Sequence, residues 1–137
     1  MKRWNVFSFF FFLAICFSAC DSENTGQNAT DEYYVKYEVN STSIYTGGKL
    51  NATINTENNK EVTIGINART QWETVIGPVK KGFNASLNVN SLSEHYGHLR
   101  LYTQISVSKN GSPFALKKID GSDTPRTSVQ INYTIDY

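Results

Sequence analysis

The chain has 137 residues, of which 39% are hydrophobic, 13% aromatic and 18% charged, and its formal net charge is +1. This length suits a single domain, and the near-zero charge argues against a general electrostatic interaction with nucleic acid. Two cysteines are too few for a small fold held together by several disulfides.

The N-terminus has the layout of a secretory signal peptide. Lys2 and Arg3 precede a mostly apolar run that continues to Ala19, and small residues lie next to Cys20. This run is shorter than the roughly 20 apolar residues that a membrane-spanning helix needs. We therefore expect residues 1–19 to form a signal peptide that is removed.

The tetrad FSAC at residues 17–20 resembles the lipobox of bacterial lipoproteins. Small residues at Ser18 and Ala19 suit the peptidase channel, and the thiol of Cys20 is the nucleophile that would carry a diacylglyceryl group. Several acyl chains would make membrane anchoring stable. A rival frame that ends at Cys16 places a bulky isoleucine at the cut, and ordinary cleavage without lipidation is the alternative to both frames.

Residues 21–31 contain one alanine and no larger apolar side chain, so they cannot bury enough surface to offset the entropy of ordering. We expect residues 20–31 to form a lipidated N-terminus and flexible tether, followed by a domain over residues 32–137. The expected location is the bacterial cell envelope, at the outer rather than the inner membrane, with the domain facing the periplasm or the cell surface. The sequence does not decide which membrane leaflet holds the lipid. Acidic residues after Cys20 resemble the surface-export signals of some lipoproteins, whereas Asp21 resembles the inner-membrane retention signal of others.

The remainder of the chain alternates apolar and polar side chains with a period of two, and no segment shows a helical stripe. Tyr33, Val35 and Tyr37, for example, alternate with Tyr34 and Lys36. Because side chains of a strand alternate between the two faces of a sheet, each such run predicts a strand with one buried and one solvated face. The predicted strands cover residues 33–39, 50–55, 61–68, 72–76, 83–90, 99–108, 113–118 and 129–135.

Turn residues separate these runs. Asn110-Gly111 is the strongest two-residue hairpin signal, because both positions tolerate a positive φ, and it should pair the strand over 99–108 with that over 113–118. Residues 57–60 should form a second hairpin. Gly77-Pro78 should end the segment that begins at Trp72.

Short strands with one apolar face and no evident helix predict an all-β fold, an immunoglobulin-like antiparallel β-sandwich of seven to eight strands. A closed barrel is the alternative, but the uneven strand lengths favour the sandwich.

Four segments carry a family resemblance. They are YVKYEV at 34–39, GKLNATINTENNKEV at 48–62, TQWETVI at 70–76 and LRLYTQISVSKNGSP at 99–113. In order, these segments resemble small cell-envelope proteins with an immunoglobulin-like sandwich, and are similar to the mycobacterial small membrane proteins that accompany lipid transporters. The chain departs from that family by carrying a lipobox in place of an uncleaved membrane helix. The resemblance implies the fold and an envelope location, and no functional residues.

Aromatic side chains are the candidate ligand-binding residues. Trp72 shares the frame of its strand's apolar positions and is expected in the core, with an exposed ring for a sugar or peptide as the alternative. Tyr34 and Tyr102 fall on the polar faces of their strands, and Tyr96 lies in a polar loop. If Tyr34 and Tyr102 share a sheet face, they could form a ligand platform, or more simply a stabilising cross-strand pair.

His95 and His98, with Glu94 beside them, form the richest candidate cluster for binding a metal. They lie on a loop, where no helix places both rings on one face and no further ligand is known to be near. The sequence contains no Gly-x-Ser-x-Gly motif and no phosphate-cradling loop. We therefore expect a non-catalytic binding or assembly module without catalytic residues, bound metal or cofactor. Its expected partners are the membrane, through the N-terminal lipid, and an envelope protein complex or a glycan. A carbohydrate-binding accessory lipoprotein and a small metal-dependent enzyme are the alternatives.

Overall fold

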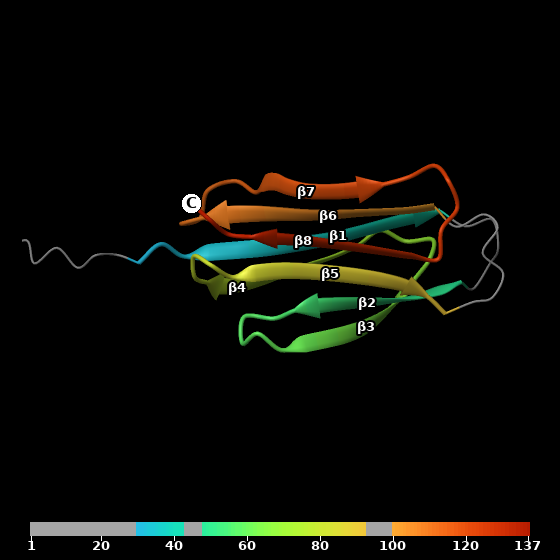
Figure 1. Ribbon diagram of the computed structural model, residues 1–137, viewed down its shortest axis with the longest axis horizontal. Coiled ribbons are helices and arrows are strands. Elements are labelled where there is room, and N and C mark those ends of the chain that lie inside the picture. The colour runs from blue at the N-terminus through green and yellow to red at the C-terminus, as the bar shows by residue number, and fades with distance from the viewer. Residues whose placement is uncertain (1–29, 43–47, 93–99) are drawn as a thin grey trace, which may run out of the picture.

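The computed structural model describes residues 30–42, 48–92 and 100–137. These residues form eight strands, with no helix among them (Figure 1): β1 (Tyr33–Thr42), β2 (Lys49–Asn55), β3 (Glu61–Asn67), β4 (Trp72–Val79), β5 (Asn84–Ser91), β6 (Arg100–Lys109), β7 (Ala115–Gly121) and β8 (Ser128–Thr134). The predicted signal peptide, Cys20, the tether up to residue 29 and the loop with Glu94, His95, Tyr96 and His98 lie outside the described residues.

The strands form two antiparallel four-stranded sheets, in the orders β4-β1-β6-β7 and β3-β2-β5-β8. This arrangement confirms the predicted antiparallel two-sheet sandwich, for which seven to eight strands were expected. In the constant immunoglobulin domain the first strand pairs with the second, whereas here β1 pairs with β4 and β6. The architecture is therefore the expected sandwich, but its strand order differs from that of the constant immunoglobulin domain.

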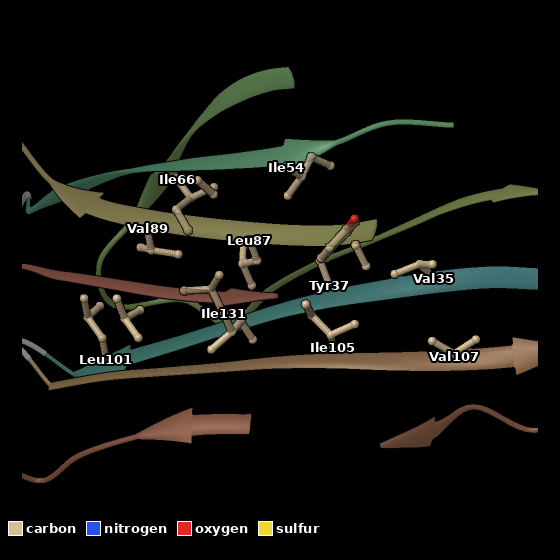
Figure 2. Close-up of a cluster of buried hydrophobic side chains, with 14 of the residues drawn as sticks. Val35, Tyr37, Ile54, Ile66, Leu87, Val89, Leu101, Ile105, Val107 and Ile131 are labelled. Atoms are coloured by element: carbon tan, nitrogen blue, oxygen red, sulfur yellow. The ribbon is translucent and has the colours of Figure 1, made fainter. Parts of the chain in front are cut away.

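The core lies between the sheets and comes from the apolar positions of the alternating runs. Figure 2 shows side chains of both sheets converging, with Val35, Tyr37 and Ile105 on one side and Leu87 and Ile131 on the other. All five are at most 3% exposed. Among the described residues, the core cluster extends from Tyr33 to Ile135 and draws on both sheets.

Both predicted hairpins are confirmed. Asn110 and Gly111 have φ values of 50° and 76°, which a tight two-residue turn requires, and this turn joins β6 to β7. The turn between β2 and β3 closes through hydrogen bonds that the amides of Thr56 and Asn59 donate to the carbonyls of Lys60 and Thr56. Local turn chemistry therefore decides both connections.

The prediction that Gly77-Pro78 ends its strand is wrong, because β4 continues through both residues to Val79. The pairing with β1 shifts register here: Val35 lies opposite Ile76, whereas Tyr33 lies opposite Val79. A bulge of this kind accommodates a proline, which has no amide hydrogen to donate. β4 is also an edge strand, so its outer side has no ladder that the proline could interrupt.

The chain enters the sandwich at the end that also holds the C-terminus (Figure 1). We call this the N-terminal end; it comprises residues 30–33, the turns at 56–60, 80–83 and 110–112, and residues 135–137. The amide of Gly82 donates to the carbonyl of Ile135 at 2.8 Å, and the amide of Asn110 donates to the carbonyl of Glu32 at 2.8 Å. These bonds connect Ile135 to the turn between β4 and β5, and Glu32 to the turn between β6 and β7.

Candidate functional site

Four large apolar side chains lie exposed near one face of the sandwich, the outer face of the β4-β1-β6-β7 sheet. Val75 is 49% exposed, Phe114 40%, Leu116 53% and Ile119 54%. Val75 lies opposite Lys36, which turns its side chain away from the core between the buried Val35 and Tyr37. Leu116 lies opposite Ser106, which in turn lies opposite Lys36. We call Val75, Phe114, Leu116 and Ile119 the outer apolar patch.

Charged side chains occupy the middle of this patch. Lys36 Nζ lies 3.1 Å from Glu38 Oε2 and 4.0 Å from Glu73 Oε2, and it also lies 5.7 Å from the centroid of the Phe114 ring. The side chains of Lys36 and Glu38 are only 24% and 14% exposed. The outer face therefore combines a partly shielded ion pair with exposed apolar side chains, and a gathering of exposed apolar side chains is a feature of interaction surfaces.

A β-bulge in β7 explains why two of these apolar residues share a face. Residues three apart on a regular strand point to opposite faces. Here Ile105 lies opposite Lys118 while Ser106 lies opposite Leu116, so Lys117 is an extra residue. The bulge brings both Leu116 and Ile119 to the solvated face.

Tyr34 and Tyr102 share this outer face but lie at opposite ends of it. Tyr34 lies opposite Ser108, and Tyr102 lies opposite Asn40. Asn40 follows Tyr34 by six residues on β1, which corresponds to about 20 Å. The predicted cross-strand pair is therefore wrong, and the two rings are too far apart to stack on one sugar unit.

Tyr102 instead covers Gly121, which lies opposite it on β7. Its hydroxyl donates a hydrogen bond to Asp123 Oδ1, in the connection that leads to β8. This bond raises the pKa of the Tyr102 hydroxyl above its ordinary value, because the neighbouring carboxylate opposes ionisation. The ring therefore has a structural role against a glycine backbone.

Trp72 lies opposite Val39 and turns toward the core, as its frame predicts. It is only partly buried, although it packs against the core cluster. The reason is its position at the start of an edge strand, where no further strand covers its outer side. The Trp72 side chain therefore points toward the core, as expected, but it is not completely buried.

Tyr96 lies outside the described residues, as do Glu94, His95 and His98, the candidate metal ligands of the less favoured enzyme alternative. Within residues 30–42, 48–92 and 100–137, no group of three or more His, Cys, Asp or Glu residues is placed to hold a metal ion. In the same ranges, no helix is long and apolar enough to cross a membrane.

The N-terminal end holds a second polar cluster. Lys109 Nζ lies 2.6 Å from Asp31 Oδ2, and Asn110 Nδ2 donates to Asp31 Oδ1 at 2.8 Å. The bond from Lys109, followed by that from Asn110, lowers the pKa of Asp31. Asp31, which the sequence assigns to the flexible tether, is therefore held against the turn between β6 and β7.

The ring of Tyr33 connects this cluster to the C-terminus. Its hydroxyl donates to the carbonyl oxygen of Tyr137, and the two rings meet edge to face with centroids 5.7 Å apart. Lys117 Nζ lies 4.0 Å from the centroid of the Tyr137 ring. The first strand and the last residue of the chain are thus joined at the N-terminal end.

Sequence reasoning missed the outer apolar patch. The segment FALKKI at 114–119 places apolar residues at spacings of two and three, which break a regular alternation. That break is the available signal of a bulge with apolar residues on the solvated face. No protein-family model matches the sequence, and no curated protein matches it.

Proposed function

We propose that the chain is a lipid-anchored protein of the bacterial cell envelope that binds a protein partner through the outer face of its β4-β1-β6-β7 sheet and has no catalytic role. The observation that carries the binding role is the outer apolar patch, where four large apolar side chains are each at least 40% exposed. Such residues are usually scattered singly over a soluble domain, and a gathering on one sheet face is typical of an interaction surface.

The ion pairs of Lys36 with Glu38 and Glu73 lie among these apolar residues. A partner that covers the patch would take this charge pair out of water, so it must offer polar groups at the centre and apolar groups at the periphery. This requirement suits a folded protein surface better than a sugar, because Phe114 is the one patch member with an aromatic ring for stacking. We therefore assign the patch to a protein of the envelope complex.

The anchor is supported by the tetrad FSAC, with Cys20 as the acylated residue. Residues 21–29 separate this cysteine from the described domain, and their mostly polar composition suits a spacer. The arrangement would hold a binding domain close to the membrane while its sheet faces stay accessible. We propose that the protein is anchored to the outer membrane rather than the inner one, with its domain on the periplasmic or the external side.

Fractionation of cells that express Cys20→Ala tests the anchor. We expect the wild-type protein in the membrane fraction and the variant in the soluble fraction. Cys16→Ala is the matched control, because it removes a thiol within the signal peptide and should leave the protein in the membrane fraction. The same distribution for the wild-type protein and Cys20→Ala would overturn the anchor.

Site-specific photocrosslinking in cells tests the binding face. A photoreactive side chain placed at Ile119 should give a discrete crosslinked protein, and Lys36→Ala in the same chain should reduce its yield. Val62 on β3 is the control position, because it is also apolar and 42% exposed but belongs to the other sheet. Equal crosslinking from Val62 and Ile119, or none from Ile119, would argue against the assigned face.

A further inference from the structure

A hollow opens at the N-terminal end between the β2–β3 turn and the turn that connects the two sheets. It has a volume of about 320 Å³ and is lined by Glu57 and Asn59 of the β2–β3 turn and by residues 78–83, which are the end of β4 and its connection to β5. This volume is at the lower limit for small-molecule sites. It suits a small polar group rather than an extended chain.

Two lysines dominate the charge of this hollow. Lys80 and Lys81 both line it, and both are exposed. Over the described ranges, neither has a carboxylate within the 4.0 Å of an ion pair, whereas Lys36 and Lys109 are both paired with carboxylates. Two adjacent unpaired ammonium groups are a suitable site for a phosphate, since Lys binds phosphate as a compact point charge.

The hollow also contains a carboxylate and an amide. Glu57 and Asn59 come from the opposite turn and line the same space. Pro78 and Phe83 supply apolar surface. A ligand with a phosphate on one side and an ammonium group on the other would match the lysines and Glu57 at once.

The position of the hollow relative to the anchor selects the source of such a ligand. Val79, directly before Lys80, lies opposite Tyr33, the first residue of β1. The ten peptide units between the Cα atoms of Cys20 and Thr30 can span at most about 36 Å. A lipid on Cys20 would therefore hold the N-terminal end within reach of the membrane surface, where even weak binding of a headgroup is favoured by its high local concentration.

We propose that the hollow between the β2–β3 and β4–β5 turns binds the phosphoethanolamine headgroup of membrane phospholipid, with Lys80 and Lys81 on the phosphate and Glu57 on the ammonium group. This inference rests on the lipid anchor proposed above, because the anchor presents the N-terminal end to the membrane. Headgroup binding orients the sandwich with its N-terminal end on the bilayer and leaves the outer apolar patch free to meet a partner.

Vesicle sedimentation with the unlipidated chain 21–137 tests the proposal. This chain contains all the core residues that the structure describes, and its fold is checked by circular dichroism. We expect several-fold more sedimentation with vesicles of phosphatidylcholine and phosphatidylethanolamine in equal parts than with phosphatidylcholine alone. Equal sedimentation with both vesicles, or none with either, would overturn the headgroup assignment. Because the chain carries no lipid, the outcome is independent of whether Cys20 is acylated in cells.

Variants assign the binding to the hollow. The double variant Lys80→Ser/Lys81→Ser should lose at least tenfold in vesicle affinity, and Glu57→Gln should lose the preference for phosphatidylethanolamine. The matched control is Lys49→Ser/Arg100→Ser, which removes the same charge at the far end of the sandwich and should bind as the wild type does. If the control pair loses as much affinity as the Lys80/Lys81 pair, binding is a general charge effect and the site is refuted.

A titration with free O-phosphoethanolamine distinguishes a membrane lipid from a soluble phosphate ester as the ligand of the hollow. We expect millimolar binding, seen as chemical-shift changes at the amides of Lys81 and Gly82, together with competition against the vesicles. Micromolar binding of the free compound without vesicle binding would show that the ligand is a soluble phosphate ester and would overturn the membrane assignment.

Discussion

Lys109 Nζ lies 2.6 Å from Asp31 Oδ2, and this ion pair fixes the point at which the N-terminal segment joins the sandwich. Asp31 precedes the first strand, and Lys109 ends the sixth, so the pair joins segments that are distant in the sequence. The amide of Glu32 also donates to Asn110 Oδ1 at 2.9 Å. Together these contacts hold Asp31 and Glu32 against the turn between β6 and β7.

The first prediction concerns the pH dependence of this contact. The folded-state pKa of Asp31 is lowered, from an ordinary value of 3.8. A carboxyl with a depressed folded pKa stabilises the fold fully above its unfolded pKa, and this contribution is lost as the pH falls through the folded pKa. In urea unfolding, D31N should be less stable than the wild type at pH 7, and the difference should shrink below about pH 4.

Glu32→Gln is the control for this prediction. Glu32 is adjacent and exposed, and its side chain makes no ion pair within the described part of the chain. Its replacement should leave the pH dependence close to that of the wild type. A difference between D31N and the wild type that stays constant from pH 7 to pH 3 would contradict the role of the Asp31 carboxylate.

The second prediction concerns a hydrogen bond between the two sheets. The buried hydroxyl of Tyr37 on β1 donates to the carbonyl of Asn55, the last residue of β2, at 3.1 Å, and burial raises its pKa. Tyr37→Phe removes the donor and leaves a carbonyl without this partner, so the free energy of unfolding should fall by about 1 kcal/mol. Tyr34→Phe, on the outer face of the same strand, should change it by less than about 0.5 kcal/mol. Equal effects of the two substitutions in urea titrations would contradict this role.

The third prediction concerns the tyrosine that covers a glycine. A Cβ at Gly121 would overlap Cδ1 of Tyr102, and the ring could move only by giving up its bond to Asp123. Gly121→Ala should therefore destabilise the fold by about 1–3 kcal/mol. Gly65→Ala on β3 is the control, since nothing lies within 4 Å of its Cβ position, and it should be neutral or slightly stabilising.

Tyr102→Ala provides the internal test of this third prediction. When Tyr102 is already absent, Gly121→Ala should cost little, because the overlap has been removed. A full loss of stability from Gly121→Ala in that background would show that the ring is not the cause. Thermal unfolding of the four chains completes the cycle.

The fourth prediction separates buried from exposed leucines. Leu87 is fully buried between Ile54 and Ile131 on the neighbouring strands. Leu87→Ala should lower the free energy of unfolding by about 2–5 kcal/mol, because it leaves a cavity in the core. Leu116→Ala, in the outer apolar patch, should change it by no more than about 0.5 kcal/mol. A large loss of stability from Leu116→Ala would mean that the patch is part of the core rather than a surface for a partner.

The strands and their buried faces were predictable because the signals are local. Alternation placed Val35 and Leu87 in the core, and Asn110-Gly111 set the hairpin between β6 and β7. The order of strands was not predictable in this way, because the position of β1 between β4 and β6 depends on contacts between distant segments. The prediction that Gly77-Pro78 ends its strand was wrong for the same reason. A strand can continue through this proline because β4 lies at the edge of its sheet, which the local sequence does not reveal.

The candidate site was less predictable than the fold. Tyr34 and Tyr102 were correctly assigned to outward positions, but their separation depends on the register between β1 and β6. The irregular spacing in residues 114–119 signals a bulge, but which side chains it exposes depends on the pairing of β7 with β6. The hollow at the N-terminal end is formed by two turns that are distant in the sequence, so no local pattern could reveal it.

Mass spectrometry of the N-terminal peptide of the mature protein, purified from bacterial membranes, tests the membrane anchor most directly. Lipidation predicts that the peptide begins at Cys20 and carries a diacylglyceryl thioether. A mature peptide with an unmodified Cys20, or one that begins after Cys20, would contradict the proposed anchor.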